Sequence, residues 1–494
     1  MNRSPLTGLV VIAALTQPAL ARADEALEDR LGEMEERLDQ VEKKTVLDSL
    51  SITGEYRTVL NAFFYEGPTP DAYDKVAPTD PVGRQIEEDV GEVWSHRLRL
   101  RFLAEPVRSV RVTARMVLYK HFGDGDAPPF IQDSMTTRIP RDSTARFDQA
   151  WVDWFMTEWL ALSAGRIAYT EGNPAELREN STVRRATWGL HMVDGEYDTI
   201  NLTVSLAKLL EGWYMRLFYA SWFNDNDKDP FGATAYLSSG TENLRIYGGN
   251  MDMQVPGLGK NFLQVGYYVV PRFRPFVVPI PDPGYVPDDD PTRAPAPLNG
   301  GLLFPSKMPA SMGAYQNVSA LLVLYDLFGT GLDVFGSAAF GFLKPNNRGI
   351  RYQVPSDLSD PSSPRMEFPF LFLSSTGDDG STTFIYTGLR YALPIGETNR
   401  PKIGFEFNYG SRYLISFGTP TDQLINKLAT RGTAYETYFI MPINDIMFLK
   451  LTHLYVKNDY YGGFFGPNPA AFGSTAPEID QKTHNVGLTL DIAL

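Results

Sequence analysis

The stretch Ser95–Phe102, SHRLRLRF, alternates basic and apolar side chains: Arg97, Arg99 and Arg101 are interleaved with leucine and phenylalanine. Successive side chains of a β-strand point to opposite faces, so one face of such a strand carries three guanidinium groups and the other only apolar groups. The stretch therefore predicts a strand in a sheet that has a polar side and an apolar side.

The same period of two recurs along nearly the whole chain. Three early strands contain Leu50–Phe64, the opening stretch and Val110–Leu118. Helical periodicity is absent from Leu47 onward. The number of segments with this alternation predicts sixteen strands in total. The other thirteen are expected at 145–156, 160–168, 192–206, 211–223, 241–254, 260–272, 314–327, 330–344, 382–393, 400–413, 432–442, 444–457 and 482–494.

The connections between these strands alternate between two kinds. Seven are short turns and eight are long, polar and rich in glycine and proline, which is the pattern of an up-and-down antiparallel barrel. Bacterial outer-membrane barrels have this asymmetry, with short periplasmic turns and long extracellular loops. The long loops are expected at 66–91, 122–144, 169–191, 224–240, 273–313, 345–381, 414–431 and 458–481.

The width of a sixteen-stranded barrel predicts which face is outside. Its lumen is too wide for wall side chains to fill, so we expect a wet, polar interior and an apolar exterior in contact with lipid. The last strand, which ends in alternating Val486, Leu488, Leu490, Ile492 and Leu494, resembles the C-terminal strand of bacterial outer-membrane proteins. We predict an all-β transmembrane barrel of about 16 strands in the bacterial outer membrane.

The N-terminus has a different composition. Residues 1–23 have the features of a secretory signal peptide, with Arg3, a short apolar core and an Ala21-Arg22-Ala23 cleavage site. Residues 24–46 are predicted to form a short periplasmic coiled-coil helix, and 47–494 the barrel. The formal charge of −14 becomes −16 when Arg3 and Arg22 are removed, which argues against nucleic-acid binding.

The predicted helix has a heptad seam of apolar side chains. This seam predicts a homo-oligomer, such as a trimer, held together by the coiled coil. A single amphipathic helix lying against the barrel is the alternative. The seam consists of Leu27, Leu31, Met34, Leu38 and Val41.

A family resemblance follows from this layout. A signal peptide, a short coiled coil and a barrel with the early strands FDQAWVDWF (147–155) and LSAGRIAYTEGNP (162–174) resemble an uncharacterised family of Gram-negative outer-membrane porin-like proteins with an N-terminal coiled coil. The resemblance implies an outer-membrane channel, with no particular solute.

Charged side chains on the polar faces of the strands are the candidate site. A wet lumen accommodates them, and charged walls set ion selectivity in pores. One interpretation is a cationic strip that influences which solutes pass, and the other is a structural lattice of ion pairs. The candidate pore-lining residues are Arg97, Arg99, Arg101, Arg111, Arg115, Glu55, Arg57, Asp153, Glu406, Arg412 and Glu436.

The longest loop is a second candidate. Residues 271–313 contain eleven prolines, so the loop is stiff, and it either enters the lumen as a plug or stays on the surface.

Enzymatic and cofactor chemistry has no support in the sequence. There is no cysteine, the five histidines lack metal-ligand spacing, and no catalytic motif occurs, so we expect neither an enzyme nor a cofactor or metal site. His453 and His484 lie on late strands that are expected to be neighbours.

The predicted function is passive or facilitated diffusion of small hydrophilic solutes across the outer membrane. Two alternatives remain: a structural protein tethered to the cell wall or a partner by its coiled coil, and a barrel that sheathes a partner such as an electron-transfer protein.

Overall fold

The computed structural model describes most of the barrel and parts of its connections. The described residues are 50–68, 85–121, 145–181, 184–189, 193–223, 244–273, 280–281, 302–303, 313–346, 350–355, 364–370, 379–396, 399–418, 425–460 and 478–494. The predicted signal peptide, the predicted coiled coil and most of the proline-rich loop lie outside these residues. No helix in the described part of the chain has the length and apolar character needed to span a membrane.

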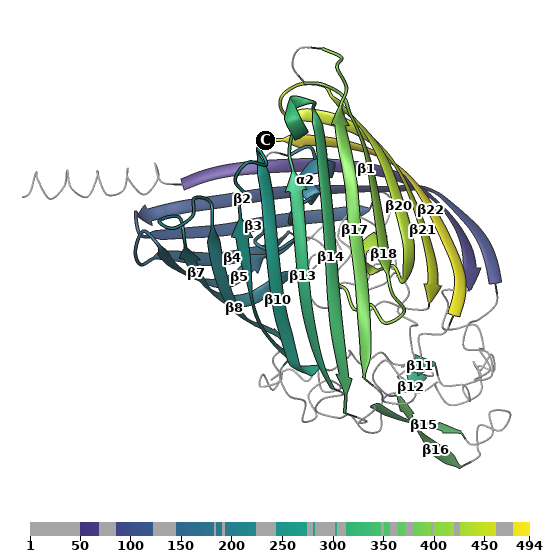
Figure 1. The fold of residues 1–494 in the computed structure, drawn as a ribbon. Coiled ribbons are helices and arrows are strands. Elements are labelled where there is room, and N and C mark those ends of the chain that lie inside the picture. The colour runs from purple at the N-terminus through teal and green to yellow at the C-terminus, as the bar shows by residue number, and fades with distance from the viewer. Residues whose placement is uncertain are drawn as a thin grey trace, which may run out of the picture.

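Sixteen antiparallel strands form one closed barrel (Figure 1). Each strand pairs with its neighbours in chain order, and β1 closes the ring by pairing with β22 from Glu55↔Ala493 to Glu66↔Lys482. The strands are β1 (Leu50–Pro68), β2 (Gln85–Val107), β3 (Val110–His121), β4 (Arg146–Phe155), β5 (Leu160–Ala168), β7 (Glu196–Ser205), β8 (Tyr214–Phe223), β9 (Leu244–Met253), β10 (Asn261–Phe273), β13 (Gly313–Leu324), β14 (Leu332–Pro345), β17 (Gly380–Ala392), β18 (Lys402–Gly410), β20 (Gly432–Pro442), β21 (Met447–Tyr460) and β22 (Glu478–Ala493).

The predicted all-β barrel of sixteen strands is thus confirmed. Most strand boundaries agree with the sequence to within a few residues, because the period of two ends where the strand ends. The main difference is at the first hairpin. There β1 and β2 extend to Pro68 and back from Gln85, well into the segment expected to be a long loop.

The outer face of the barrel is apolar. Large side chains at alternate positions are exposed there, including Ile52, Leu217, Phe340 and Leu451. Because a closed sheet pairs its backbone groups internally, a barrel with such a belt is stable in a bilayer. The protein is therefore a porin-like barrel of the bacterial outer membrane.

An aromatic row marks one edge of this belt. Phe407, Tyr435, Tyr455 and His484 are paired in register across the four adjacent strands β18, β20, β21 and β22. The ring centroids of successive members are 5.2, 6.2 and 4.7 Å apart. Aromatic girdles of this kind lie at the membrane–water interface.

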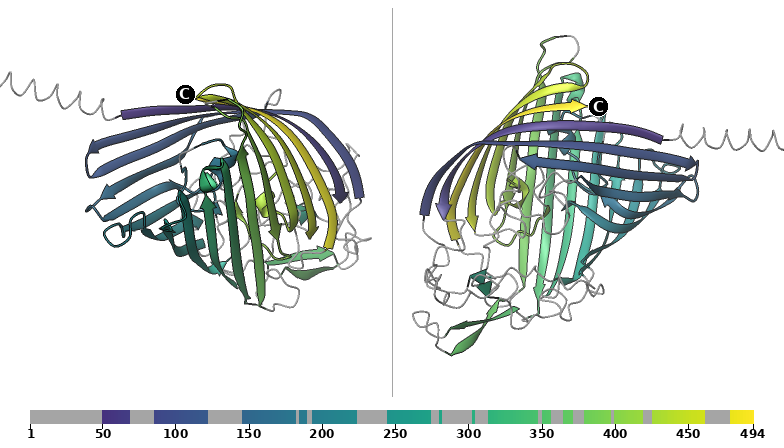
Figure 2. Two further views of the ribbon diagram at one scale, coloured as in Figure 1. Left: turned by 45° about the horizontal axis from the view of Figure 1, so that its top comes forward. Right: turned by 180° about the vertical axis from the view of Figure 1, so that it is seen from behind.

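Smaller elements lie between the barrel strands. Two short sheets pair β11 (Ile280–Pro281) with β12 (Leu302–Leu303), and β15 (Ile350–Pro355) with β16 (Arg365–Phe370). The remaining elements, α2 (Ala175–Arg178), β6 (Val193–Asp194), η1 (Leu327–Gly329), β19 (Phe417–Gly418) and η2 (Lys427–Ala429), follow β5, β13 and β18. Figure 1 places α2 near the end of the barrel that carries the short turns, and Figure 2 shows the ring from two further sides.

Candidate functional site in the barrel lumen

A segment that follows β5 runs inside the barrel. We call its described residues, 169–181 and 184–189, the inward segment. It contains α2, whose four residues are all buried. The sequence predicted a polar surface loop here, so its position inside the ring is a new finding.

The tip of the inward segment reaches strands on the far side of the ring. The backbone carbonyl of Leu177 accepts a hydrogen bond from Arg390 on β17 at 2.8 Å. Tyr325, in the short turn after β13, donates from its hydroxyl to Glu176 at 2.6 Å. Asn180 contacts Lys402 at the start of β18. The segment therefore crosses the lumen near its periplasmic end.

Glu171 anchors the inward segment to the arginine strip. Its Oε1 accepts hydrogen bonds from Arg99 at 2.6 Å and from Arg97 at 3.3 Å, both on β2. Its Oε2 accepts one from Arg185, on the same segment, at 2.8 Å. Arg185 also lies 2.8 Å from Glu55 of β1. Three guanidinium groups thus meet on one carboxylate that does not belong to the barrel wall.

Glu179 anchors the tip of the segment. Its Oε2 accepts from Arg57 of β1, and its Oε1 lies 3.7 Å from the ammonium group of Lys450 on β21. Arg57 also donates from Nε to Asp491 of β22 at 2.6 Å. Because these charged groups are buried away from water, each is stabilised by its ion-pair partners.

A second segment, 411–418 with 425–431, also enters the lumen. Its Lys427 contacts both Glu406 of β18 and Glu436 of β20. Glu436 in turn lies 3.3 Å from Arg178 of the inward segment. β19 of the second segment also pairs in parallel with β6, which follows the inward segment in the chain. Ion pairs therefore continue from β18 to β2 through the interior.

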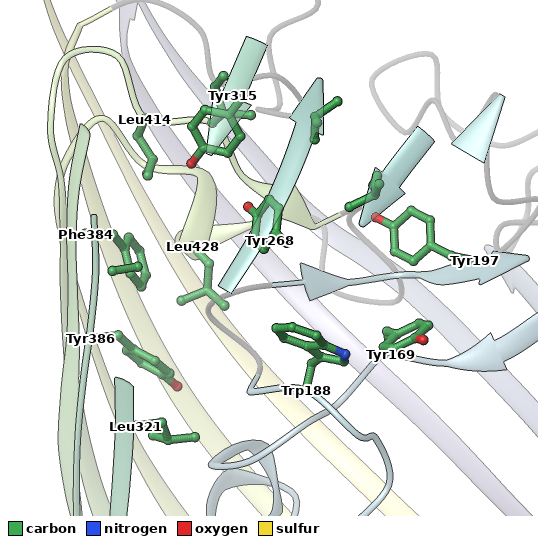
Figure 3. Close-up of a cluster of buried hydrophobic side chains, with 14 of the residues drawn as sticks. Tyr169, Trp188, Tyr197, Tyr268, Tyr315, Leu321, Phe384, Tyr386, Leu414 and Leu428 are labelled. Atoms are coloured by element: carbon green, nitrogen blue, oxygen red, sulfur yellow. The ribbon is translucent and has the colours of Figure 1, made fainter. Parts of the chain in front are cut away.

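Another part of the interior holds an apolar cluster, which differs from the expectation of a wet, polar lumen. Trp188 of the inward segment packs edge-on against Phe218 and Tyr268, with centroids 4.9 and 6.5 Å apart. Figure 3 shows this cluster, in which side chains of β7, β10, β13 and β17 surround residues of both inward segments. The difference arises because residues of two chain segments pack against wall side chains in this part of the lumen. The cluster includes Tyr169, Trp188, Tyr197, Tyr268, Tyr315, Leu321, Phe384, Tyr386, Leu414 and Leu428.

Most of the candidate pore-lining residues meet in the ion-pair network. They are largely shielded from open water, which favours the lattice interpretation for them. Arg115, the one not yet described, pairs with Asp148 at 2.6 Å. The candidates in the network are Glu55, Arg57, Arg97, Arg99, Arg115, Glu406 and Glu436.

The remaining four candidates lie outside the network. Arg101 is half-buried, with its guanidinium 5.9 Å from the ring centre of Trp151. Arg111 pairs with Glu105 in an exposed position. Asp153 accepts from Ser163 at 2.6 Å. Arg412, predicted within a strand, lies two residues beyond the end of β18 and stacks near Tyr413 and Tyr460.

Burial and nearby charges raise the pKa of one acidic group of the inward segment and lower the pKa of two others. Burial raises the pKa of Glu179, but Arg57, Lys450 and Arg178 outweigh it and lower this pKa to about 2. Burial opposes ionisation of Glu171 too, yet Arg99 and Arg185 hold its pKa well below 4.5. For Glu176, burial dominates and its pKa is raised. The first two carboxylates are therefore held in the charged form.

His453 and His484 are neighbours, as expected from their strands. Their ring nitrogens Nε2 and Nδ1 lie 3.3 Å apart on the exposed outer face. In the described residues no group of three or more histidine or acidic side chains has an arrangement that would hold a metal ion.

The inward segment left a weak signal in the sequence. Tyr169, Leu177 and Trp188 are large apolar residues in a connection otherwise rich in charges of both signs. A surface loop gains nothing from such residues, whereas a segment that packs on an apolar wall and a charged wall needs both kinds.

Family comparison assigns the chain to an uncharacterised family. The model of the family described as "Protein of unknown function (DUF3373)" matches residues 87–269 and 302–479, well over half of the chain. The chain belongs to this family. The resemblance to an uncharacterised family, predicted from the sequence, is thereby confirmed. A comparison with curated protein sequences finds no match.

Several solved structures are similar to the barrel at low sequence identity. OprB of Pseudomonas putida is 13% identical, with 91% of this chain and 95% of that chain covered, at a TM-score of 0.45. An anion-selective porin from Comamonas acidovorans is 10% identical (90% and 100% covered, TM-score 0.43). The channel DcaP of Acinetobacter baumannii is 11% identical (90% and 97% covered, TM-score 0.41). At these values, neither solute nor selectivity carries over to this chain.

Proposed function

We propose that this DUF3373 protein is an outer-membrane channel for small hydrophilic solutes, narrowed by its inward segment. One observation carries the proposal. The segment that crosses the lumen is held mainly by side-chain ion pairs and hydrogen bonds, while the barrel wall is complete without it. Movement of the segment therefore changes the aqueous path without breaking the backbone hydrogen bonds between the barrel strands.

The arginine strip has a part in this function. Arg97 and Arg99 hold the segment, and Arg101 faces the same interior from the next inward position of β2. Charged walls of this kind bias the passage of ions. We propose that the strip favours anionic solutes where the segment leaves it accessible.

The other candidate functions have less support. A sheath for a partner protein needs a lumen free of its own chain, whereas two segments of this chain pack inside the described barrel. A tether depends on residues 24–46, which lie outside the described residues. A trimer held by that coiled coil stays a prediction for the same reason.

Conductance of the purified protein in a planar lipid bilayer tests the proposal. We expect discrete open-channel steps from the natural protein. Replacing 174–181 by a glycine-serine linker of equal length should give larger steps, because the tip no longer crosses the lumen. A barrel that is folded but silent in both forms would contradict the channel function.

Ion preference tests the strip. The reversal potential in a salt gradient should shift toward cation preference in the triple variant Arg97→Ala, Arg99→Ala, Arg101→Ala. Glu105→Gln, which alters an exposed pair at a short turn, is the matched control and should leave the reversal potential unchanged. An unchanged potential in the triple variant would restrict these arginines to a structural role.

A further inference from the structure

The contacts of Glu171 have the form of a bound anion in a site of its own. Its two carboxylate oxygens accept three charge-assisted hydrogen bonds, from Arg97, Arg99 and Arg185. Glu55 is a second acidic partner of the same arginines and contacts Arg97 and Arg185. Guanidinium groups bind carboxylates and phosphates through the same planar donor geometry.

The charges of this site do not balance without Glu171. Arg99 and Arg185, whose ion pairs among the described residues are with Glu55 and Glu171, would then share the single carboxylate of Glu55, which leaves an excess positive charge in a buried place. A buried excess of this size demands a counter-ion. An oxyanion from solution satisfies that demand as well as the Glu171 side chain does.

The site also has hydrogen-bond donors that Glu171 does not use. Arg99 is 5% exposed, and its buried Nε has no acceptor among the described residues. The Nε of Arg101, one inward position further along β2, is likewise buried without an acceptor in this part of the chain. Arg101 makes no ion pair with any described residue, so a larger oxyanion has donors available beyond the Glu171 position.

The position of Glu171 makes it a replaceable occupant. It belongs to the inward segment, and its backbone φ of 57° is in the left-handed region, which a non-glycine residue rarely adopts. Strain of this kind persists where the surroundings enforce it, often at ligand sites. The neighbouring Arg185 side chain is 27% exposed, so water inside the barrel reaches the site there.

We infer that Arg97, Arg99 and Arg185 form an oxyanion-binding site of the lumen, and that the Glu171 carboxylate is its tethered occupant. The ligand class is a small solute with a carboxylate or phosphate group, which displaces Glu171 and frees that end of the inward segment. This inference rests on the proposed channel function only in taking the ligand to be a solute in transit.

Calorimetric titration of the purified, detergent-solubilised full chain tests the site directly. The probes are succinate and inorganic phosphate, added separately at low ionic strength, so that the carboxylate and phosphate sources are distinguished. Glu171→Ala removes the tethered competitor, whose effective concentration is on the order of millimolar, so we expect binding about tenfold tighter than in the natural protein. Glu171→Gln is the second variant, should the alanine variant fail to fold.

Two further variants make the test specific. Adding Arg99→Ala to Glu171→Ala should abolish the gain, because it removes a donor of the site. Glu105→Ala frees Arg111 at an exposed position and should not tighten binding. An equal gain in Glu105→Ala, or none in the folded Glu171 variants, would overturn the inference.

The conductance measurement separates the two proposals. Discrete channel steps without any gain in anion binding would leave the channel function standing and remove the oxyanion site. A gain in binding by a barrel that conducts no ions would establish the site and contradict the channel.

Discussion

Arg57 and Glu179 join the first strand of the barrel to the tip of a segment 122 residues further along the chain. Arg57 is simultaneously bound to Asp491 on the last strand. One guanidinium group thus links the seam where the barrel closes to the segment that crosses its lumen.

Glu179→Gln should loosen the inward segment. The change leaves Arg57 and Lys450 with fewer negative partners in a buried place, and breaking a buried ion pair in this way costs about 3–5 kcal/mol. Hydrogen exchange of residues 169–181 measures the free energy of local opening. An opening free energy equal to that of the parent would show that the pair does not hold the segment.

Glu176→Gln, three residues earlier, should not lower the free energy of opening of the inward segment. Burial raises the pKa of Glu176, so the folded state disfavours its charged form, and its side chain accepts a hydrogen bond from Tyr325. A neutral amide keeps that acceptor, and the opening free energy at pH 7 should be higher than in the parent by up to about 1 kcal/mol. Marked loosening by this variant would contradict the unfavourable burial of a charged Glu176.

Acid should release the inward segment. The pKa of Glu179 is lowered from 4.5 to about 2, and that of Glu171 also lies well below 4.5. A carboxylate with a lowered pKa in the folded state stabilises that state above its ordinary pKa and loses this contribution as the pH falls through the folded value. Docking should therefore weaken from about pH 4.5 toward about pH 2.

The fluorescence of Trp188, isolated by difference from a Trp188→Phe variant, follows this release because the indole is buried only while the segment is docked. In Glu179→Gln one of the two titrating groups is absent, so the change should be smaller. A signal that is flat between pH 5 and 2 would exclude acid release.

Lys427→Met should destabilise the second inward segment. The substitution leaves the carboxylates of Glu406 and Glu436 buried and without their shared ammonium group, at a cost of about 3–5 kcal/mol. Lys457→Met removes the cation of an exposed pair with Asp459 on the outer face and should cost less than about 1 kcal/mol. Chemical denaturation in detergent compares the two variants, and equal effects would contradict the burial of Lys427.

Trp188→Ala should leave a cavity in the apolar cluster inside the barrel. Truncation of a buried tryptophan costs about 3–5 kcal/mol, here as loss of docking of the inward segment, because the wall strands remain paired. The same change at Trp154, which is 49% exposed on the outer face, should leave hydrogen exchange of 169–181 unaltered. Loosening by both variants alike would mean that the segment does not pack on Trp188.

The barrel itself was predictable because its information is local. Polar and apolar residues alternate along each strand, as in Ser95–Phe102, and this alternation identifies its two faces. The alternation of short and long connections gives the strand order. Closure, strand number and the outward direction of Leu98 and Leu100 then follow from the need to pair every backbone group in lipid.

The contents of the lumen could not be predicted in this way. Glu171, Glu179 and Lys427 lie in connections without periodicity, and their partners are on strands far away in the sequence. When the two groups of an ion pair come from different parts of the barrel, the number of residues between them follows no rule that the sequence could reveal.

The sequence by itself thus determined a lipid-facing barrel and a row of arginines on its inner face. Only the tertiary structure decided that a carboxylate of the inward segment pairs with Arg97 and Arg99 and that an aromatic cluster packs inside the barrel. The physical reason is that a strand's faces are set by its immediate neighbours, whereas a buried charge is stabilised by whichever segment the closed barrel brings to it.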